Sequence, residues 1–120
     1  MRKVFVVDDD PYFRSALRMK LRQEGYDVLA TGSGLDLLRE LQNSKVDAIV
    51  LDLNMPGLPG LEVLRRLAAD PVLSSIPVLV ATAERDSRTR SQCLALGARE
   101  CHMKPVSLQR LAASVAAYVS

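Results

Sequence analysis

The sequence predicts an α/β domain in which a five-stranded parallel sheet is covered on both faces by five helices. Three observations support this class. Short apolar runs alternate with helical patterns five times, no linker or repeat interrupts the alternation, and 120 residues are enough for one domain with a proper core. Strands buried on both faces appear as nearly continuous apolar runs. Regular alternation then requires right-handed crossovers and a parallel sheet.

The first half of the chain contains two of these strand–helix pairs. A strand over residues 3–7 precedes a helix that begins at Asp10-Pro11 and ends at Gly25. Proline is tolerated in the first turn of a helix, and glycine commonly ends one. The second strand, over 27–30, is less uniformly apolar, so we expect it at a sheet edge. The second helix begins near Ser33.

The second half contains three further strands, and the expected ranges are 48–53, 77–82 and 100–103. A turn rich in proline and glycine, over 56–60, leads from the third strand to the third helix. Leucines at helical spacing identify the third and fifth helices. The fourth helix has a shorter apolar set, which consists of Cys93, Leu94 and Leu96, and Gly97 ends it.

Composition limits the classes of function. The chain is 48% hydrophobic and 25% charged, with a formal charge of +2, which is ordinary for a globular protein. It has no apolar stretch long enough for a membrane span and no apolar leader, so we expect a cytoplasmic location without membrane contact. Basic residues are spread along the chain, so we expect no direct nucleic-acid binding. Cys93 and Cys101 lack metal-type spacing, and we expect both to be reduced.

Polar residues stand at the ends of the predicted strands. Three consecutive acids, Asp8 to Asp10, follow the first strand, and Asp52 follows the apolar part of the third. Thr82 and Lys104 end the fourth and fifth. In an open parallel sheet, residues after the strands line the ligand crevice. Clustered carboxylates repel one another, and a hard cation such as Mg²⁺ relieves the repulsion. The pattern predicts a site for a phosphoryl group.

These motifs resemble the receiver domain of two-component response regulators, and the resemblance covers essentially the whole chain. It rests on four segments in order: Val6-Val7-Asp8-Asp9-Asp10, Leu51-Asp52-Leu53-Asn54-Met55-Pro56 with Gly60 behind it, Ala81-Thr82-Ala83, and Lys104-Pro105. The resemblance implies a flavodoxin-like fold with strand order 2-1-3-4-5 and a single receiver domain over residues 1–120.

The resemblance also implies roles for the strand-end residues. Asp52 corresponds to the phosphoacceptor, whose carboxylate forms an acyl phosphate. Asp9 corresponds to a direct ligand of Mg²⁺, with Mn²⁺ as an alternative ion, and Asp8 acts through a bound water. The remaining protein ligands are Asp52 and the backbone carbonyl of Asn54. Lys104 is expected to hold a phosphoryl oxygen.

Thr82 is expected to hydrogen-bond the phosphoryl group, and the residues around it tune the switch. Ala83 and Glu84 follow it directly. Glu84 and Asn54 together are expected to flank the path of hydrolytic water. Cys101 stands where the family usually has Tyr or Phe, which puts the usual aromatic readout in doubt. The family also usually has a cis peptide before the proline, so we expect one at Lys104-Pro105.

The implied function is a phosphorylation switch that catalyses only its own phosphorylation and dephosphorylation. The expected donor is a histidine kinase or a phosphotransfer protein. The expected output surface, for a partner or domain that the sequence does not identify, comprises the fourth helix, fifth strand and fifth helix, about residues 86–119.

Three other functions compete with the switch. A Mg²⁺-dependent phosphohydrolase with an Asp nucleophile needs a second Asp two residues on, where Asn54 stands. A flavin module needs a phosphate-binding loop where three acids stand. A degenerate receiver that only binds a partner would not need the intact Asp52, Thr82 and Lys104. Taken alone, Asp10 fits a helix cap, and we expect His102 to be structural.

Overall fold

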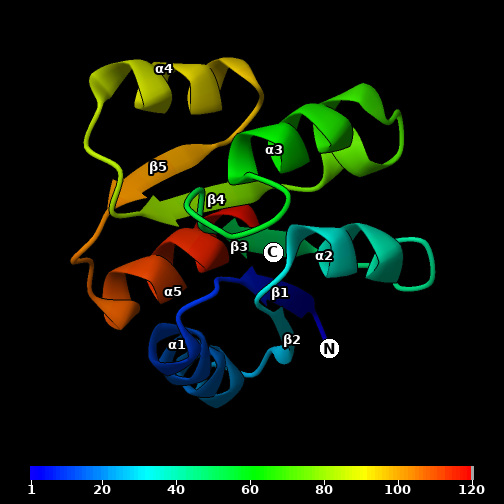
Figure 1. The fold of residues 1–120 in the computed structure, drawn as a ribbon. Coiled ribbons are helices and arrows are strands. Elements are labelled where there is room, and N and C mark those ends of the chain that lie inside the picture. Colours follow the sequence, from blue (N-terminus) through cyan, green and yellow to red (C-terminus); the bar gives the residue numbers. More distant parts are fainter. Residues whose placement is uncertain (120) are drawn as a thin grey trace.

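The computed structural model describes residues 1–119, which fold into the predicted alternation of strands and helices (Figure 1). The elements are, in chain order, β1 (Lys3–Val7), α1 (Pro11–Gln23), β2 (Asp27–Thr31), α2 (Gly34–Glu40), β3 (Ala48–Leu51), α3 (Gly60–Ala69), η1 (Leu73–Ser75), β4 (Val78–Thr82), α4 (Ser87–Ala95), β5 (Glu100–Met103) and α5 (Leu108–Tyr118).

All five strands pair in parallel in the order β2-β1-β3-β4-β5, which confirms the predicted fold and the edge position of β2. The pairing of β1 with β3 places Val7 opposite Leu51. The residues that follow, Asp8 and Asp52, are therefore neighbours, and the amide of Asp52 donates to the carbonyl of Val7 over 2.9 Å. Strand register alone brings these two carboxylates to the same edge of the sheet.

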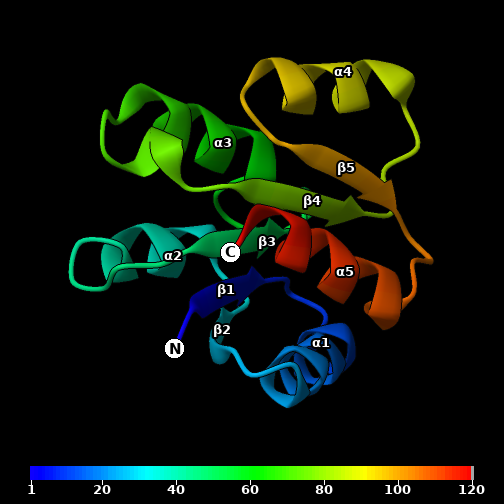
Figure 2. The same cartoon turned by 180° about the vertical axis from the view of Figure 1, so that it is seen from behind.

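Two apolar layers enclose the sheet, with α1 and α5 on one face and α2, α3 and α4 on the other (Figures 1 and 2). Side chains of β1 alternate between the layers. Val4 and Val6 pack with α1 and α5, whereas Phe5 and Val7 pack with the opposite helices. Burial on both faces explains why the strands are almost continuously apolar.

Three details differ from the sequence prediction. The third strand ends at Leu51 rather than residue 53, because the amide of Asn54 donates to the Asp52 carboxylate and turns the chain out of the ladder. Leu94 of α4 is exposed, and only Cys93 of that helix is buried. The short helix η1 was not predicted, and it begins where the Asp70 carboxylate accepts two amide hydrogen bonds.

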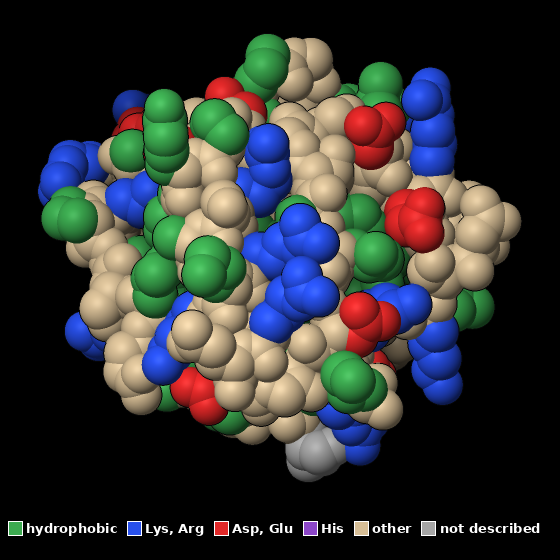
Figure 3. Space-filling model, turned by 90° about the horizontal axis from the view of Figure 1, so that it is seen from below, with side chains coloured by type: hydrophobic (Ala, Val, Ile, Leu, Met, Phe, Trp, Pro, Cys, Tyr) green, Lys and Arg blue, Asp and Glu red, His purple; other side chains and the backbone are tan. Residues whose placement is uncertain are grey.

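The charges on the surface are mixed, as they are along the sequence. On the face that carries α1, basic, acidic and apolar side chains are intermixed (Figure 3). Within residues 1–119, no helix is both long and apolar enough to cross a bilayer.

Candidate functional site

Three carboxylates meet beyond the ends of β1 and β3. Asp8, Asp9 and Asp52 each offer an oxygen, and these oxygens all lie within 4.8 Å of one another. Asp8 is 2% exposed and Asp52 is 6% exposed, whereas Asp9 lies at the surface. Carboxylates this close repel one another when ionised, and burial strengthens the repulsion between Asp8 and Asp52. The sheet thus assembles the acid cluster that the sequence predicted.

Asp8 is the most constrained member of the cluster. Its Oδ1 accepts the amide of Asp10 over 2.9 Å, and its Oδ2 lies 2.7 Å from Nζ of Lys104. Burial raises the pKa of Asp8 above its usual value, and the charge of Asp52 adds to the rise. The hydrogen bonds from Lys104 and the Asp10 amide oppose it without cancelling it. The folded protein therefore disfavours the ionised form of Asp8.

Asp9 differs from its neighbour, because no hydrogen bond to its carboxylate occurs within residues 1–119. Its exposed oxygens are free to take a new partner, whereas both oxygens of Asp8 already have one. The expectation that Asp9 is the direct metal ligand and that Asp8 acts through water stays a prediction.

Lys104 reaches the cluster from the end of β5. Its Nζ lies 3.7 Å from Oδ2 of Asp52, in addition to its short contact with Asp8. The ammonium also lies 4.2 Å from the centre of the Phe13 ring, within the range of a cation–π interaction. The predicted cis peptide between Lys104 and Pro105 is present, and the Lys104 amide donates to the carbonyl of Thr82 over 2.8 Å.

Asp52 stands on a close-packed turn. Its Oδ1 accepts the amide of Asn54 over 3.2 Å. A Cβ at Gly60 would lie 2.7 Å from the carbonyl oxygen of Asp52 and 2.5 Å from Cα of Leu53. Only glycine lets the start of α3 come this close to the backbone of Asp52 and Leu53, which explains why residue 60 is a glycine. The start of α3 therefore presses on the backbone that carries Asp52.

Thr82 ends β4 and is 1% exposed. Its hydroxyl accepts the amide of Glu84 over 3.2 Å. The Glu84 carboxylate in turn accepts the amides of Arg85 and Asp86, so here it shapes the loop that leads to α4. Ala83 between them is exposed. The loop after β4 is thus organised by hydrogen bonds that begin at the threonine hydroxyl.

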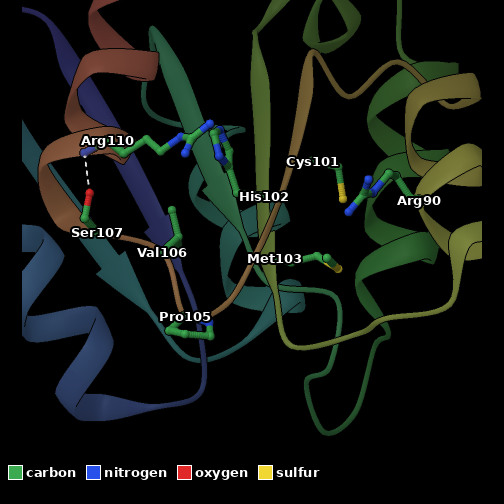
Figure 4. A pocket seen from close by; sticks show the side chains of 8 residues that line it. All are labelled: Arg90, Cys101, His102, Met103, Pro105, Val106, Ser107 and Arg110. Carbon is green, nitrogen blue, oxygen red and sulfur yellow. Dashed lines mark hydrogen bonds between the residues drawn. The ribbon is translucent and has the colours of Figure 1, made fainter.

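The remaining predicted residues lie away from the carboxylates. Cys101 and Met103 point toward α4, whereas His102 points to the opposite side of β5 (Figure 4). The His102 ring is 2.8 Å from the Glu100 carboxylate and 3.2 Å from the Ser114 hydroxyl, contacts that suit the expected structural role. Cys93, from the apolar set of the fourth helix, is fully buried.

The charges of the cluster fit a divalent cation. When ionised, the three carboxylates carry two more negative charges than the single ammonium beside them can compensate. Mg²⁺ prefers a few carboxylate and carbonyl oxygens together with water, and exposed Asp9 leaves room for water. The donor set contains oxygen only, without thiolate or imidazole, which favours a hard ion over a soft one.

Two residues of α1 support the site and were not predicted to do so. Phe13 faces the Lys104 ammonium, and Nη1 of Arg14 donates to the Asp8 carbonyl over 2.8 Å. Phe13 packs against the apolar cluster between α1, α5 and the sheet. No local signal indicates that its ring meets a lysine more than ninety positions later, because that contact depends on how α1 packs.

Known proteins resemble this chain along almost its whole length. The family model described as response regulator receiver domain matches residues 4–116. The DNA-binding response regulator MtrA of Mycolicibacterium smegmatis is 36% identical over 97% of this chain and 50% of its own length. The response regulator MprA of a Mycobacterium species is 38% identical over 96% of this chain and 49% of its own. The chain therefore spans about half the length of these relatives.

Solved structures agree with the sequence matches. The chemotaxis protein CheY4 of Vibrio cholerae superposes with a TM-score of 0.91 at 27% identity, over 99% of both chains. The receiver domain of the Francisella response regulator 1452 gives the same TM-score at 26% identity, over 98% of this chain and 96% of its own.

Proposed function

Because this chain belongs to the response regulator receiver domain family, we propose that Asp52 accepts a phosphoryl group from a histidine kinase or a phosphotransfer protein. An oxygen of Asp52 attacks phosphorus and forms an acyl phosphate, while the bond from phosphorus to the donor nitrogen breaks. The observation that carries this proposal is the position of the Lys104 ammonium, 3.7 Å from Oδ2 of a buried Asp52 that lies beside two further acids.

Lys104 would neutralise charge on the transferred group. Phosphoryl transfer spreads negative charge over the three peripheral oxygens, and an ammonium already aimed at the acceptor stabilises it without further reorganisation. Asp8 and the Phe13 ring hold the ammonium in place before the reaction. When phosphorylation converts the Asp52 carboxylate into an acyl phosphate, Lys104 is expected to contact the new phosphoryl oxygens.

The metal assigned to this site is Mg²⁺, with Mn²⁺ as an alternative. Asp9, Asp52 and the backbone carbonyl of Asn54 would hold it, and Asp8 would contact it through water. When bound, the ion would supply positive charge next to the phosphoryl oxygens and would reduce repulsion between donor and acceptor. The chain's own contribution is to keep Asp9 exposed and Asp8 fixed by its hydrogen bonds.

Thr82 would carry the signal away from the acceptor. Its hydroxyl now accepts the Glu84 amide, and it can turn away from that amide to donate to a phosphoryl oxygen. That exchange would release an amide in the loop before α4. Glu84 is the residue proposed to influence hydrolytic water, together with exposed Asn54. The surface expected to change for an output partner comprises α4, β5 and α5.

The whole protein's output belongs to this proposal as well. We propose that residues 1–120 form a single receiver domain that acts in the cytoplasm and does not itself bind nucleic acid. The relative MtrA is named as DNA-binding, so an output domain of that kind is one candidate for this signal. A phosphohydrolase is less well supported, because exposed Asn54 stands where such an enzyme needs a proton donor.

The proposal is tested with acetyl phosphate as a small phosphoryl donor in the presence of Mg²⁺. Intact-mass spectrometry should show one phosphoryl adduct on the wild-type chain and none on Asp52→Asn, because the amide is a poor nucleophile. Equal labelling of the variant would assign the acceptor to another residue. Asp47→Asn, which changes a carboxylate at the opposite end of β3, serves as the matched control and should label normally.

The metal assignment is tested by following amide NMR shifts during titration with Mg²⁺. Asp9→Asn should weaken binding more than Asp8→Asn, because the first removes a direct ligand and the second a water-mediated one. An unchanged affinity in both variants would place the metal elsewhere. The readout is binding and not phosphorylation, so it separates the metal site from the acceptor assignment.

A further inference from the structure

The two cysteines lie on adjacent elements of the expected output surface. Cys93 belongs to α4 and is fully buried, whereas Cys101 belongs to β5 and is partly exposed. Both pack in the apolar cluster that lies between the sheet and α4, together with Val80. The Cys101 sulfur points toward α4 (Figure 4). Eight positions of sequence separate the residues, yet the turn after α4 brings them to one place.

The two thiols are close enough to affect each other's chemistry. Burial, followed by the charge of Cys101 and its side-chain hydrogen bond with Cys93, raises the pKa of the Cys93 thiol to about 11. Cys93 is thus a protonated thiol that solvent does not reach, with a second thiol as its neighbour. Such a thiol is unsuited to react first with an external reagent.

Cys101, in contrast, lines an open pocket of about 390 Å³ at the edge of the sheet. Arg90 of α4 and Arg110 of α5 line the same pocket, and the guanidinium of Arg90 extends toward the Cys101 sulfur (Figure 4). No carboxylate lines this pocket within residues 1–119. The Arg90 guanidinium lies beside Cys101, whereas that of Arg110 lies beside His102 on the other side of β5 (Figure 4). Both carry positive charge into the pocket, so it suits an anionic small molecule that can reach Cys101.

We propose that Cys93 and Cys101 form a reversible disulfide when an anionic low-molecular-weight disulfide, such as oxidised glutathione, enters this pocket. The Cys101 thiolate attacks one sulfur of the oxidant and releases one reduced thiol, which leaves a mixed disulfide. Cys93 then loses its proton to solvent or to the leaving thiolate, attacks the Cys101 sulfur, and releases the second thiol. Two electrons and two protons pass from the cysteines to the oxidant.

The bond would join α4 to β5 covalently. Cys93 is the only buried side chain of α4, so this helix rests on the sheet at the position where the crosslink would form. Cys101 also occupies the position at which the family usually carries the aromatic residue of its switch. Oxidation would therefore act on the surface expected to respond to phosphorylation, through chemistry that does not need Asp52.

The sequence allows a direct assay. Trypsin cuts after Arg90, Arg99 and Arg110 and not between Lys104 and Pro105, so the cysteines fall on separate peptides, 91–99 and 100–110. The folded chain is treated with oxidised glutathione, alkylated and digested without reductant. We expect the two peptides to appear as one linked species that dithiothreitol separates. The intact chain should lose two hydrogen atoms and both alkylation sites.

Two variants test the order of the steps. Cys93→Ser should keep glutathione on Cys101 as a stable mixed disulfide, because the resolving thiol is missing. Cys101→Ser should gain no glutathione while folded, because Cys93 is buried, and should gain it in urea. Replacing Arg90 and Arg110 with Gln should slow the loss of thiols by oxidised glutathione but not by a neutral disulfide. Equal slowing with both reagents would remove the pocket's role.

Three results on the wild-type chain would overturn the proposal. One is a lasting glutathione adduct on Cys101, which would show that Cys93 does not resolve it. Another is a dimer joined through Cys101 of two copies. The third is retention of both thiols in the folded chain under conditions that oxidise it in urea. All three come from the wild-type protein, so none depends on a variant that folds.

Discussion

Lys104 shows how a single residue combines structure and reactivity. Its ammonium is shared between Asp8 at 2.7 Å and Asp52 at 3.7 Å, and the Phe13 ring lies beneath it. The closer partner is not the proposed acceptor. Asp8 thus keeps the lysine close to Asp52 while leaving Asp52 only loosely paired, a state that would suit the proposed attack of this carboxylate on phosphorus.

Burying the carboxylate of Asp8 changes the stability of the folded chain, and this change can be measured as a function of pH. Its folded-state pKa is raised, mainly by burial, so the folded chain binds this proton more tightly than the unfolded chain does. The corresponding stability is present below the ordinary Asp pKa of about 4 and is lost as pH rises through the raised value. We expect Asp8→Asn to be more stable than wild type at neutral pH in chelator.

That advantage should shrink as pH falls toward about 4, where Asp8 becomes protonated in both states. Thermal unfolding in chelator across the acidic range measures it. Excess Mg²⁺ should reduce or reverse the difference, because an ion that binds only the folded state stabilises the chain that binds it better. A variant that is less stable than wild type at neutral pH without metal would contradict this account.

At the scale of elements, the start of α3 controls the turn that carries Asp52. A methyl group at Gly60 would meet the backbone at Leu53 and Asp52, which cannot move aside as a flexible side chain can. We expect Gly60→Ala to destabilise the fold by roughly 1–3 kcal/mol through overpacking. It should also slow phosphorylation of Asp52. Urea unfolding and the acetyl phosphate assay measure the two effects.

Gly57 provides the matched control for Gly60. It has a φ of +78°, and apart from the adjoining residues of the chain no atom lies within 4 Å of the place that a Cβ would take, so alanine there adds backbone strain without crowding. Gly57→Ala should cost roughly 1–2 kcal/mol of stability and leave the phosphorylation rate close to wild type. Equal loss of rate in both variants would mean that loop strain, and not contact with Asp52, is responsible.

Helix α4 is the most weakly anchored of the elements near the site. It buries only Cys93, and its first turn depends on the Asp86 cap and on the Glu84 carboxylate before it. A helix with so little buried surface moves at low free-energy cost. The loop hydrogen bonds that begin at Thr82 end at this helix, so it is the element that a change at Thr82 reaches first.

At the scale of the whole molecule, β4 and β5 join the site to the surface that is expected to carry the output. Cys101 is small for its position, and the pocket of about 390 Å³ beside it has space for a larger side chain. Coupling between sites typically amounts to about 1–3 kcal/mol, so one missing packing contact matters. We expect Cys101→Tyr to strengthen the coupling between Asp52 and α4.

The coupling is measured by NMR shifts of α4 with and without beryllofluoride, a phosphoryl mimic, in reducing buffer. Larger shifts in Cys101→Tyr than in wild type are the expected result, and Cys101→Ser, which keeps the side chain small, should behave as wild type does. If wild type already shows shifts as large as those of the Tyr variant, Cys101 does not weaken the switch.

The local pattern of the chain was sufficient to predict the strands, the five α-helices and the edge of the sheet at which the acids lie. Short apolar runs of four or five residues between helical patterns indicate strands buried on both faces, and parallel strands bring the residues after their ends to one edge. Asp8, Asp9 and Asp52 therefore meet for a reason visible in the sequence. The expected strand order came from the family resemblance, and the pairing of the strands confirmed it.

Contacts between distant side chains could not be read in the same way. The Phe13 ring under Lys104, the choice of Asp8 as the closer partner of that lysine, and the meeting of Cys93 with Cys101 all depend on how helices pack against the sheet. Periodicity shows which face of a helix is buried but not which side chain it meets. Those meetings are set by the three-dimensional packing of elements that are far apart in the chain, and they determine both charge balance and reactivity.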